Sequence, residues 1–310
     1  MIKNLIIVKN QRMKINNFLI GLLLIGAACS TNSRETPKGH KYTLVKEGEG
    51  EAGKPGEFLL INMMIKDAKD SVWNDTRKQK LPMILPIREP QPGDEGIEEV
   101  FSVLKKGDSI LFPIAAKTLF EKQGGRVPDN VDSTSIFTFY LGVKDILDEP
   151  AVRSLEQEIM GKLNSEQLAI DEALIDGYLA ESNTEVQTTD SGLRYMFTRK
   201  GSGPTAAPGN EVSVNYAGYL LDGTLFDTSI ESVAKANGAY TPGRPYEPLT
   251  LQAGSGQVIQ GWEEAILLMN KGSKMRVWIP STLAYGPRQR SEVIKPNSIL
   301  VFDMEMMDIK

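Results

Sequence analysis

Residues 258–272 read VIQGWEEAILLMNKG, and the fold of the second half of the chain is predicted from this segment. A β-branched pair leads into a glycine and then into a short amphipathic helix, whose apolar side includes Ile266 and Leu267. The lysine and glycine at its end, up to Gly272, form a helix stop signal. Trp262 lies in the first turn of this helix. There it either packs as a large core residue or lies flat at the bottom of a cavity, with a sheet around it.

The composition of the chain indicates acidic domains without metal chemistry. A length of 310 residues favours two domains over one. The formal net charge is -5, and residues 1–28 contribute only basic charges, so the remainder is more acidic still. Such acidity argues against nucleic-acid binding. The single cysteine, Cys29, excludes a disulfide within the chain, and with His40 as the single histidine a metal site is not expected.

The N-terminal residues 1–28 resemble an export signal. A basic start precedes an apolar run over residues 18–25, which is too short to span a bilayer and fits a signal peptide. The four residues that end at Cys29 resemble a bacterial lipobox, and this resemblance implies cleavage before Cys29 and its acylation. A plain secretory signal with a free cysteine is the alternative. Met13 is a candidate for the true start, and we expect a flexible tether over residues 29–40.

The chain also repeats itself. Residues 42–50, YTLVKEGEG, align with residues 195–203, YMFTRKGSG, and further matches follow in the same order. Later in each copy, residues 97–107 align with residues 262–272. Self-similarity in a fixed order over about a hundred residues indicates two copies of one domain.

Each copy is predicted to be an α+β domain, in which a bent antiparallel β-sheet wraps on a short helix. The strand prediction rests on alternation, for example of Val212, Val214 and Tyr216 with polar residues. Residues 149–184 have few glycines and carry apolar residues every four positions, which predicts a helical linker. The apolar residues of this stripe are Leu155, Ile159, Leu163, Ile170, Leu174 and Tyr178. Its apolar stripe is expected to pack on a domain or on a second chain, and the oligomeric state is left open. The predicted domains are residues 41–148 and residues 185–310.

Four motifs of the second copy occur together in one order and spacing. They are VSVNYAGYLLDGTLFDTS at 212–229, VIQGWEEAILLMNKGSKMRVWIP at 258–280, LAYG at 283–286 and NSILVFDME at 297–305. Together they resemble the FKBP-type peptidyl-prolyl cis-trans isomerases, over about residues 191–310. The resemblance implies two FKBP-like domains and an enzyme that catalyses cis-trans exchange at X-Pro bonds. It also implies catalysis without a cofactor or metal, and it makes macrolide inhibitors candidate ligands.

The same resemblance implies a ligand pocket in the second copy, with the prolyl ring of the substrate above Trp262 as floor. The implied walls are Tyr216, Phe226 and Phe302, and the implied apolar rim is Leu249, Val258, Ile259 and Ile294. The implied donors to substrate carbonyls are the backbone N–H of Ile259 and the hydroxyl of Tyr285. Asp227 is implied as the buried polar group that faces the amide. The residues implied in catalysis are Asp227, Tyr285 and Trp262, and the others bind substrate.

Each of these residues also has a plainer interpretation. The aromatic residues fit a packed core, and Asp227 fits a turn cap. Tyr285 fits a core tyrosine bonded to backbone, and only the joint pattern favours a pocket. Two departures from the family pattern stand out. Leu249 replaces a residue that is often phenylalanine, and the long insert at 229–247 hides the arginine that often pairs with the aspartate, for which Arg244 is a candidate.

The first copy keeps the pattern of the fold but not that of the site. Tyr216, Phe226, Asp227, Trp262, Tyr285 and Phe302 are matched in register by Met63, Trp73, Asn74, Ile97, Phe120 and Phe139. Asp75 lies one position from Asn74, so the loss of the acid depends on the alignment. Without the indole and the tyrosine hydroxyl, we predict no isomerase activity there. Whether this copy is a packing scaffold or binds unfolded chains is left open.

The favoured hypothesis is a lipid-anchored isomerase of the cell envelope, on the periplasmic side or in the outer membrane. Its expected partners are the membrane and proline-containing unfolded or nascent exported proteins. Proline isomerisation takes tens to hundreds of seconds, so its catalysis would speed folding. The competing hypothesis is a non-enzymatic, chaperone-like lipoprotein whose two copies hold client chains.

Overall fold

The structure is a computed structural model that describes residues 32–89, 97–121 and 125–310. The predicted signal peptide and the predicted lipidation site Cys29 lie outside these residues. Within the described part of the chain, no helix is long and apolar enough to cross a membrane. The chain divides into two compact units, Met1–Ile159 and Met160–Lys310, and each is described by itself.

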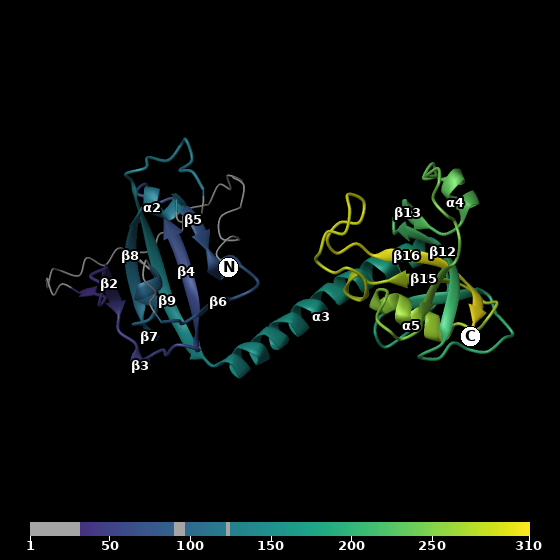
Figure 1. Ribbon diagram of the computed structural model, residues 1–310, viewed down its shortest axis with the longest axis horizontal. Coiled ribbons are helices and arrows are strands. Elements are labelled where there is room, and N and C mark those ends of the chain that lie inside the picture. Colours follow the sequence, from purple (N-terminus) through teal and green to yellow (C-terminus); the bar gives the residue numbers. More distant parts are fainter. Residues whose placement is uncertain (1–31, 90–96, 122–124) are drawn as a thin grey trace. The chain divides into compact units, whose positions relative to one another are not determined.

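The first unit is built on a seven-stranded antiparallel sheet with the order β1-β2-β8-β9-β4-β5, in which β6 also pairs with β4 (Figure 1). Along β4, every second side chain is buried, because successive side chains of a strand point to opposite faces of the sheet. The strands of this sheet are β1 (Ser33–Glu35), β2 (Lys41–Lys46), β4 (Phe58–Lys66), β5 (Val72–Asp75), β6 (Met83–Pro86), β8 (Ser109–Ala115) and β9 (Ile136–Leu147). The remaining elements are β3 (Glu49–Ala52) paired with β7 (Lys105–Lys106), η1 (Thr76–Lys78), α1 (Ile97–Phe101) and α2 (Ala116–Glu121).

The second unit repeats this topology, with the order β10-β11-β15-β16-β12-β13 and with β14 paired to β12. Its helix α5 packs on one face of the sheet and buries Trp262, Ala265 and Ile266 in the core. The strands are β10 (Gln187–Thr188), β11 (Arg194–Arg199), β12 (Glu211–Leu220), β13 (Leu225–Thr228), β14 (Leu249–Gln252), β15 (Lys274–Ile279) and β16 (Leu300–Ile309). The helices are α4 (Glu231–Ala236), α5 (Gln260–Leu268) and η2 (Ser281–Leu283). The predicted α+β fold, with two copies of one sheet topology, is confirmed.

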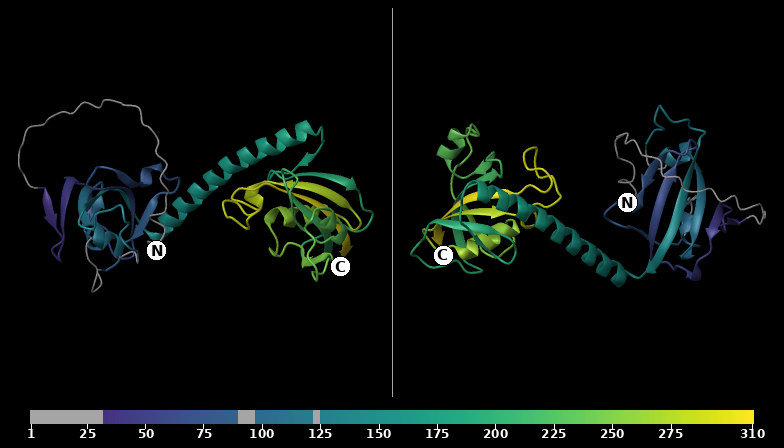
Figure 2. Two further views of the ribbon diagram at one scale, coloured as in Figure 1. Left: turned by 90° about the horizontal axis from the view of Figure 1, so that it is seen from above. Right: turned by 180° about the vertical axis from the view of Figure 1, so that it is seen from behind.

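Helix α3 (Glu149–Glu181) is one uninterrupted helix of 33 residues, as both views of Figure 2 show. Its second half buries Ile175 and Leu179 in a cluster with residues of the sheet face opposite α5, namely Trp278, Ile299 and Val301. The division between the two units therefore falls inside α3, between Ile159 and Met160. This differs from the predicted separation of a linker at 149–184 from a domain at 185–310, because Ile175 and Leu179 pack on the second unit. The predicted apolar stripe does not make this contact, since Ile170, Leu174 and Tyr178 are exposed.

The predicted flexible tether over residues 29–40 contains a strand. Strand β1 pairs with β2, and Thr36 after it is buried. Glu99 of α1 is only 1% exposed, and it accepts hydrogen bonds from the Thr36 hydroxyl and from the N–H of Lys38. His40 Nδ1 lies 2.7 Å from the same carboxylate. The prediction of a flexible segment was wrong from β1 onward, because these residues supply the partners that a buried carboxylate requires.

Candidate active site

Four aromatic rings meet in the second unit between the sheet and α5. Tyr216 lies on β12, Phe226 on β13 and Phe302 on β16, while Trp262 lies in the first turn of α5. The ring centroids are 5.1 Å apart for Tyr216 and Trp262, 5.2 Å for Trp262 and Phe302, and 5.5 Å for Phe226 and Phe302. All three pairs are edge to face, the arrangement that aromatic quadrupoles favour. The residues predicted as floor and walls therefore lie together.

Gly218 of β12 allows two of these rings to approach the sheet. A Cβ at this position would lie 2.6 Å from the Phe226 ring and 2.7 Å from the Phe302 ring, closer than carbon atoms can pack. In the strand ladders, Gly218 is opposite both Asp227 and Phe302. The sequence interpretation missed Gly218, although a glycine inside a strand pattern is a signal of such a close approach.

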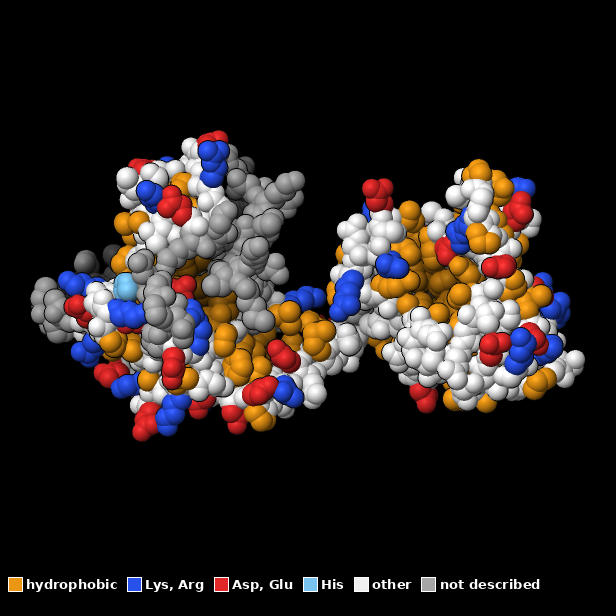
Figure 3. All heavy atoms as spheres, in the orientation of Figure 1, with side chains coloured by type: hydrophobic (Ala, Val, Ile, Leu, Met, Phe, Trp, Pro, Cys, Tyr) orange, Lys and Arg blue, Asp and Glu red, His pale blue; other side chains and the backbone are white. Residues whose placement is uncertain are grey.

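The aromatic residues of the cluster differ in solvent exposure. Trp262 is 4% exposed and Phe302 is 6% exposed, while Tyr216, Phe226 and Tyr285 are half-buried. Among the described residues, the indole N–H of Trp262 has no hydrogen-bond partner, so packing holds this ring. Figure 3 shows hydrophobic side chains gathered in a hollow of the second unit, beside the segment that carries α4.

The predicted rim residues differ in exposure. Val258 and Ile259 are half-buried and pack against the core cluster, Ile294 is buried, and Leu249 is exposed. Ile259 is the N-cap residue of α5, and its carbonyl accepts a hydrogen bond of 2.9 Å from the N–H of Trp262. The start of the helix therefore fixes the Ile259 backbone relative to the indole. The Tyr285 ring faces the guanidinium of Arg290 at 5.7 Å.

Asp227 lies at the side of the ring cluster with two side-chain partners. Its carboxylate accepts a hydrogen bond of 2.6 Å from the Tyr216 hydroxyl and pairs with the Arg244 guanidinium at 2.6 Å. Arg244 is thus the partner that the sequence interpretation named as a candidate. The Asp227 side chain is 38% exposed, so the prediction that it is buried was wrong. Solvent screens such a pair, and we assign it an orienting role rather than a large share of stability.

Aromatic residues of the insert at 229–247 hold Arg244 next to Asp227. It contains α4, followed by Tyr240 and Tyr246, whose rings stack at 5.7 Å. The Arg244 guanidinium lies 5.3 Å from the Tyr246 ring, and the Lys235 ammonium lies 4.9 Å from the Tyr240 ring. Cation–π contacts of this kind contribute about 0.5–1 kcal/mol at exposed sites. The insert is therefore not only a covering loop, since it supplies a charged partner to Asp227.

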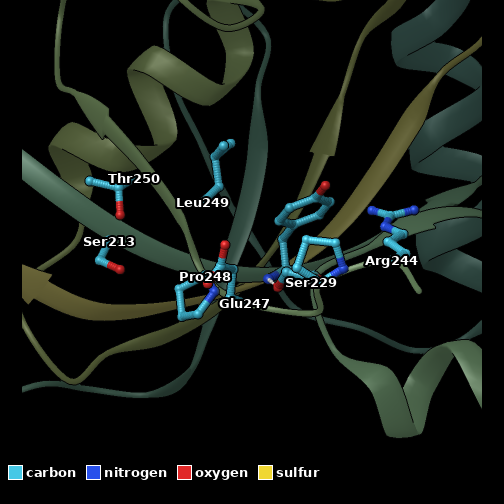
Figure 4. Close-up of a pocket in the computed structure, with 9 residues that line it drawn as sticks. Ser213, Ser229, Arg244, Glu247, Pro248, Leu249 and Thr250 are labelled. Carbon is cyan, nitrogen blue, oxygen red and sulfur yellow. Dashed lines mark hydrogen bonds between the residues drawn. The ribbon is translucent and has the colours of Figure 1, made fainter. Parts of the chain in front are cut away.

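A hollow of about 560 Å³ adjoins the ring cluster along β14. It is lined in part by Tyr216, Arg244 and Leu249, and Trp262 and Phe302 are not among its lining residues. Figure 4 shows Ser213 and Thr250 toward one side of this hollow and Arg244 on the other. The hollow extends the candidate site outward from the rings, along the edge of the sheet.

Because of Tyr216, the second unit is expected to lose stability at alkaline pH. Burial, the hydrogen bond to Asp227 and the charge of Asp227 all raise the pKa of its hydroxyl above the ordinary value of 10.0. Because the folded pKa is higher than the unfolded pKa, the stabilisation is complete below about pH 10 and is lost progressively above it. Tyr216→Phe should weaken this loss, measured as urea unfolding at about pH 8 and about pH 11. An unchanged loss in the variant would contradict this assignment.

The first unit has the same positions with different side chains. Asn74 is opposite Ile65 in the β4–β5 ladder, as Asp227 is opposite Gly218, so Asn74 and not Asp75 takes the place of the acid. Phe139 is likewise opposite Ile65, as Phe302 is opposite Gly218. Ile65 is 2% exposed, and its side chain occupies the space that glycine leaves open in the second unit. The ring cluster of the first unit consists instead of Trp73, Phe120 and Phe137, whose ring centroids are 5.1 to 6.0 Å apart.

The second unit therefore offers a non-covalent ligand site made of aromatic rings, hydroxyl groups and one carboxylate–guanidinium pair. Within the described ranges, no group of three or more His, Cys, Asp or Glu side chains is arranged to hold a metal ion. These features define a class of site that binds an apolar group in an α+β domain and orients polar groups at its edge.

Comparisons with known proteins agree with this class. Residues 203–307 match the family described as FKBP-type peptidyl-prolyl cis-trans isomerase. A probable FKBP-type peptidyl-prolyl cis-trans isomerase, FkpA of Neisseria meningitidis serogroup B, is 40% identical over 124 residues, which cover 40% of this chain and 40% of that protein. The outer membrane protein MIP of Legionella longbeachae is 30% identical over 200 residues, which cover 62% of this chain and 79% of that protein. An FK506-binding protein of Neisseria meningitidis serogroup B is 35% identical over 118 residues, which cover 38% of this chain and 96% of that protein. The chain belongs to the family of FKBP-type peptidyl-prolyl cis-trans isomerases.

Proposed function

We propose that the second unit catalyses cis-trans isomerisation of X-Pro bonds in unfolded or nascent exported proteins. The observation that carries this proposal is the edge-to-face cluster of Tyr216, Phe226, Trp262 and Phe302, bordered by Asp227. An apolar surface built from rings suits a prolyl ring, and the half-buried Tyr216 and Phe226 give access to it. The family match covers residues 203–307, so the proposed activity belongs to the unit that carries the rings.

The chemistry of the X-Pro bond explains why such a surface is sufficient. Resonance keeps the amide planar, and rotation costs about 18–20 kcal/mol although the two end states differ by only about 0.5–1 kcal/mol. Water stabilises the polar, planar form, so a site that excludes water favours the twisted state. An acceleration of about 10³ to 10⁵ requires only about 4–7 kcal/mol. A nucleophile is therefore not needed.

Each site residue has a role in this proposal. Trp262 is the floor beneath the prolyl ring, and the other aromatic residues form the walls. The N–H of Ile259 and the hydroxyl of Tyr285 donate to carbonyls of the substrate and hold them in the twisted geometry. Asp227 faces the amide, in an orientation set by its contacts with Tyr216 and Arg244. Leu249, Val258 and Ile294 exclude water at the rim.

The proposal places the enzyme at a membrane surface through an acylated Cys29. Its support is the sequence alone, namely the apolar run over residues 18–25 before the single cysteine of the chain. Each buried methylene of an acyl chain contributes about 0.8 kcal/mol, so two or three chains anchor a protein stably. An enzyme held there would meet exported chains as they fold. A macrolide of the FK506 type is proposed to compete with substrate for the ring cluster.

The first unit is proposed to lack isomerase activity for two reasons. Ile65 fills the space that Gly218 leaves open in the second unit, and Phe120, which has no hydroxyl, takes the place of Tyr285. One observation favours a client-binding role for this unit instead. Val72, Trp73 and Ile136 are exposed apolar side chains, and the Trp73 ring contacts Phe137 at 5.1 Å. Such a surface suits extended apolar segments of an unfolded chain.

An isomerase assay with a proline-containing tetrapeptide tests the proposed function on the full chain. Wild type should accelerate the exchange, and Asp227→Ala should lower kcat/KM by about tenfold or more, because the oriented carboxylate is lost. Asp222→Ala is the matched control. Asp222 is exposed in the neighbouring turn, where it accepts a hydrogen bond from the N–H of Thr224, and its loss should leave kcat/KM unchanged.

Two results would decide against this function. Wild type without measurable acceleration, but with suppression of client aggregation, would favour the non-enzymatic binding protein. Equal losses in Asp227→Ala and Asp222→Ala would assign the effect to the fold of the turn rather than to the carboxylate.

A further inference from the structure

Helix α3 is joined to the loop before β16 through a buried carboxylate. Asp171 of α3 is 0% exposed, and one of its oxygens accepts hydrogen bonds from the N–H and the hydroxyl of Ser281, at 2.7 and 2.6 Å. Ser281 is also 0% exposed. The other carboxylate oxygen accepts a hydrogen bond of 2.8 Å from the side chain of Gln167. Three donors thus compensate the desolvation of a carboxylate that would otherwise be costly to bury.

Ser281 in turn fixes the backbone on both sides of Tyr285. Its carbonyl accepts hydrogen bonds from the N–H of Ala284, at 3.0 Å, and from the N–H of Gly286, at 2.9 Å. The residues before and after Tyr285 are therefore tied to one carbonyl. That carbonyl belongs to the residue whose N–H and hydroxyl Asp171 holds.

The other end of this loop returns to the same helix. The N–H of Asn297 donates to the carbonyl of Gly286 at 2.7 Å, and the Asn297 side chain donates to Gln167 at 2.9 Å. Asn297 has a φ of 58°, in the left-handed region that asparagine tolerates better than most residues. Gln167 and Asp171 thus close a ring of hydrogen bonds around the loop that carries Tyr285.

The first unit has a different residue and a different hydrogen bond at the position of Ser281. In the alignment of the two copies, Phe120 stands for Tyr285, and Ala116 stands for Ser281. Alanine has no hydroxyl, and the N–H of Ala116 donates to the carbonyl of Ser135 at 2.8 Å. A serine at this position of the second unit is therefore explained by its partner on α3, not by the turn itself.

We propose that Asp171 is a positioning residue for the isomerase reaction, which sets the location of the Tyr285 hydroxyl by holding Ser281. The proposal rests on the proposed function, in which Tyr285 donates to a substrate carbonyl. Helix α3 then serves the active site and is more than a spacer between the units. Displacements of about 1 Å in a catalytic arrangement can cost about 100-fold in rate, so a loosened loop should be measurable.

The first test compares three substitutions in the full chain. Asp171→Ala leaves the Ser281 donors without an acceptor and should lower kcat by about tenfold or more, with a smaller change in KM, because the rings remain. Asp171→Asn should restore much of kcat, since a carboxamide oxygen still accepts from Ser281. Asp176→Ala is the matched control on the same helix. It removes an ion pair of 3.2 Å with Arg194 of β11, not a contact with the loop, and should leave kcat unchanged.

A double-mutant cycle with Tyr285→Phe separates positioning from general destabilisation. If Asp171 acts through the Tyr285 hydroxyl, Asp171→Ala should have little further effect on kcat once that hydroxyl is absent. The same fold-loss in both backgrounds would overturn the proposal, and so would wild-type kcat in a folded Asp171→Ala. If Asp171→Ala does not fold, the cycle is made with Ser281→Ala, which loses only the hydroxyl donor. Wild type without isomerase activity would overturn the proposed function and this inference together, whereas active wild type with an unaffected Asp171→Ala overturns the inference alone.

Discussion

Trp262→Ala is expected to lower the free energy of unfolding of the second unit by about 3–5 kcal/mol and to abolish isomerase activity. The indole is 4% exposed and contacts the rings of Tyr216 and Phe302 at 5.1 and 5.2 Å, so its removal leaves a cavity beneath the walls of the site. Urea unfolding followed by tryptophan fluorescence in a Trp73→Phe background measures the stability, because Trp278, the tryptophan that remains, is buried in the same unit. A tetrapeptide assay below the unfolding transition measures the activity.

Met306→Ala is the control for this substitution. Met306 is 0% exposed in the same core, but it is not one of the ring residues or rim residues of the site. Its truncation should cost about 2–5 kcal/mol, while kcat/KM of the folded fraction stays close to wild type. If both variants lose activity in proportion to their stability, Trp262 is a core residue without a role as floor.

Gly201→Ala is expected to destabilise the second unit by about 3 kcal/mol or more. A Cβ at Gly201 would lie 2.3 Å from the carbonyl oxygen of Lys271 and 2.6 Å from the N–H nitrogen of Ser273. Both are backbone atoms, so no side chain can rotate away, and the strands on either side must shift. The loss should appear in urea unfolding followed by tryptophan fluorescence in the Trp73→Phe background, where Trp262 and Trp278 both report on the second unit.

The repeat provides a matched pair for Gly201. Gly48 takes the same place in the first unit, where a Cβ would lie 2.0 Å from the carbonyl oxygen of Lys106. Gly48→Ala should therefore destabilise the first unit and leave the fluorescence transition of the second unit unchanged in the Trp73→Phe background. Gly177→Ala in α3 is the opposite control, since nothing lies within 4 Å of a Cβ there, and it should stabilise by about 0.5–1 kcal/mol. A harmless Gly201→Ala would contradict the close approach of these backbones.

The ring cluster was predictable from the sequence because its members occupy strand and helix positions with a regular period. Alternation placed Tyr216 and Phe302 on the inner face of the sheet, and the start of the helix motif placed Trp262. The exposure of Asp227 was not predictable, because it depends on how the insert covers it. Arg244 could be named only as a candidate for the same reason, since the insert has no period that fixes its path.

The attachment of α3 to the site was beyond sequence analysis. Asp171 and Ser281 are 110 positions apart in the chain, and neither position has a pattern that identifies the other. The sequence pattern predicted that Ile170, Leu174 and Tyr178 pack on a domain or on a second chain, but these residues are exposed. Ile175 and Leu179 are instead the apolar residues of α3 that are buried against the second unit. Residues 29–40 were predicted to be flexible because their composition is polar, and polar composition does not indicate the hydrogen bonds that Thr36 and Lys38 donate to Glu99.

Alternation, helix signals and internal repetition were enough to predict two α+β copies, and the resemblance of four motifs indicated the family of the second copy and different side chains at the site positions of the first. These properties follow from local periods and motif spacing, which a linear chain records directly. Only the tertiary structure showed three features of the site. These are the pairing of Asp227 with Arg244, the close approach of two rings at Gly218, and the hydrogen bonds that join α3 to the loop of Tyr285. They arise from contacts between distant segments, whose energies are set by packing and burial rather than by neighbours in the chain.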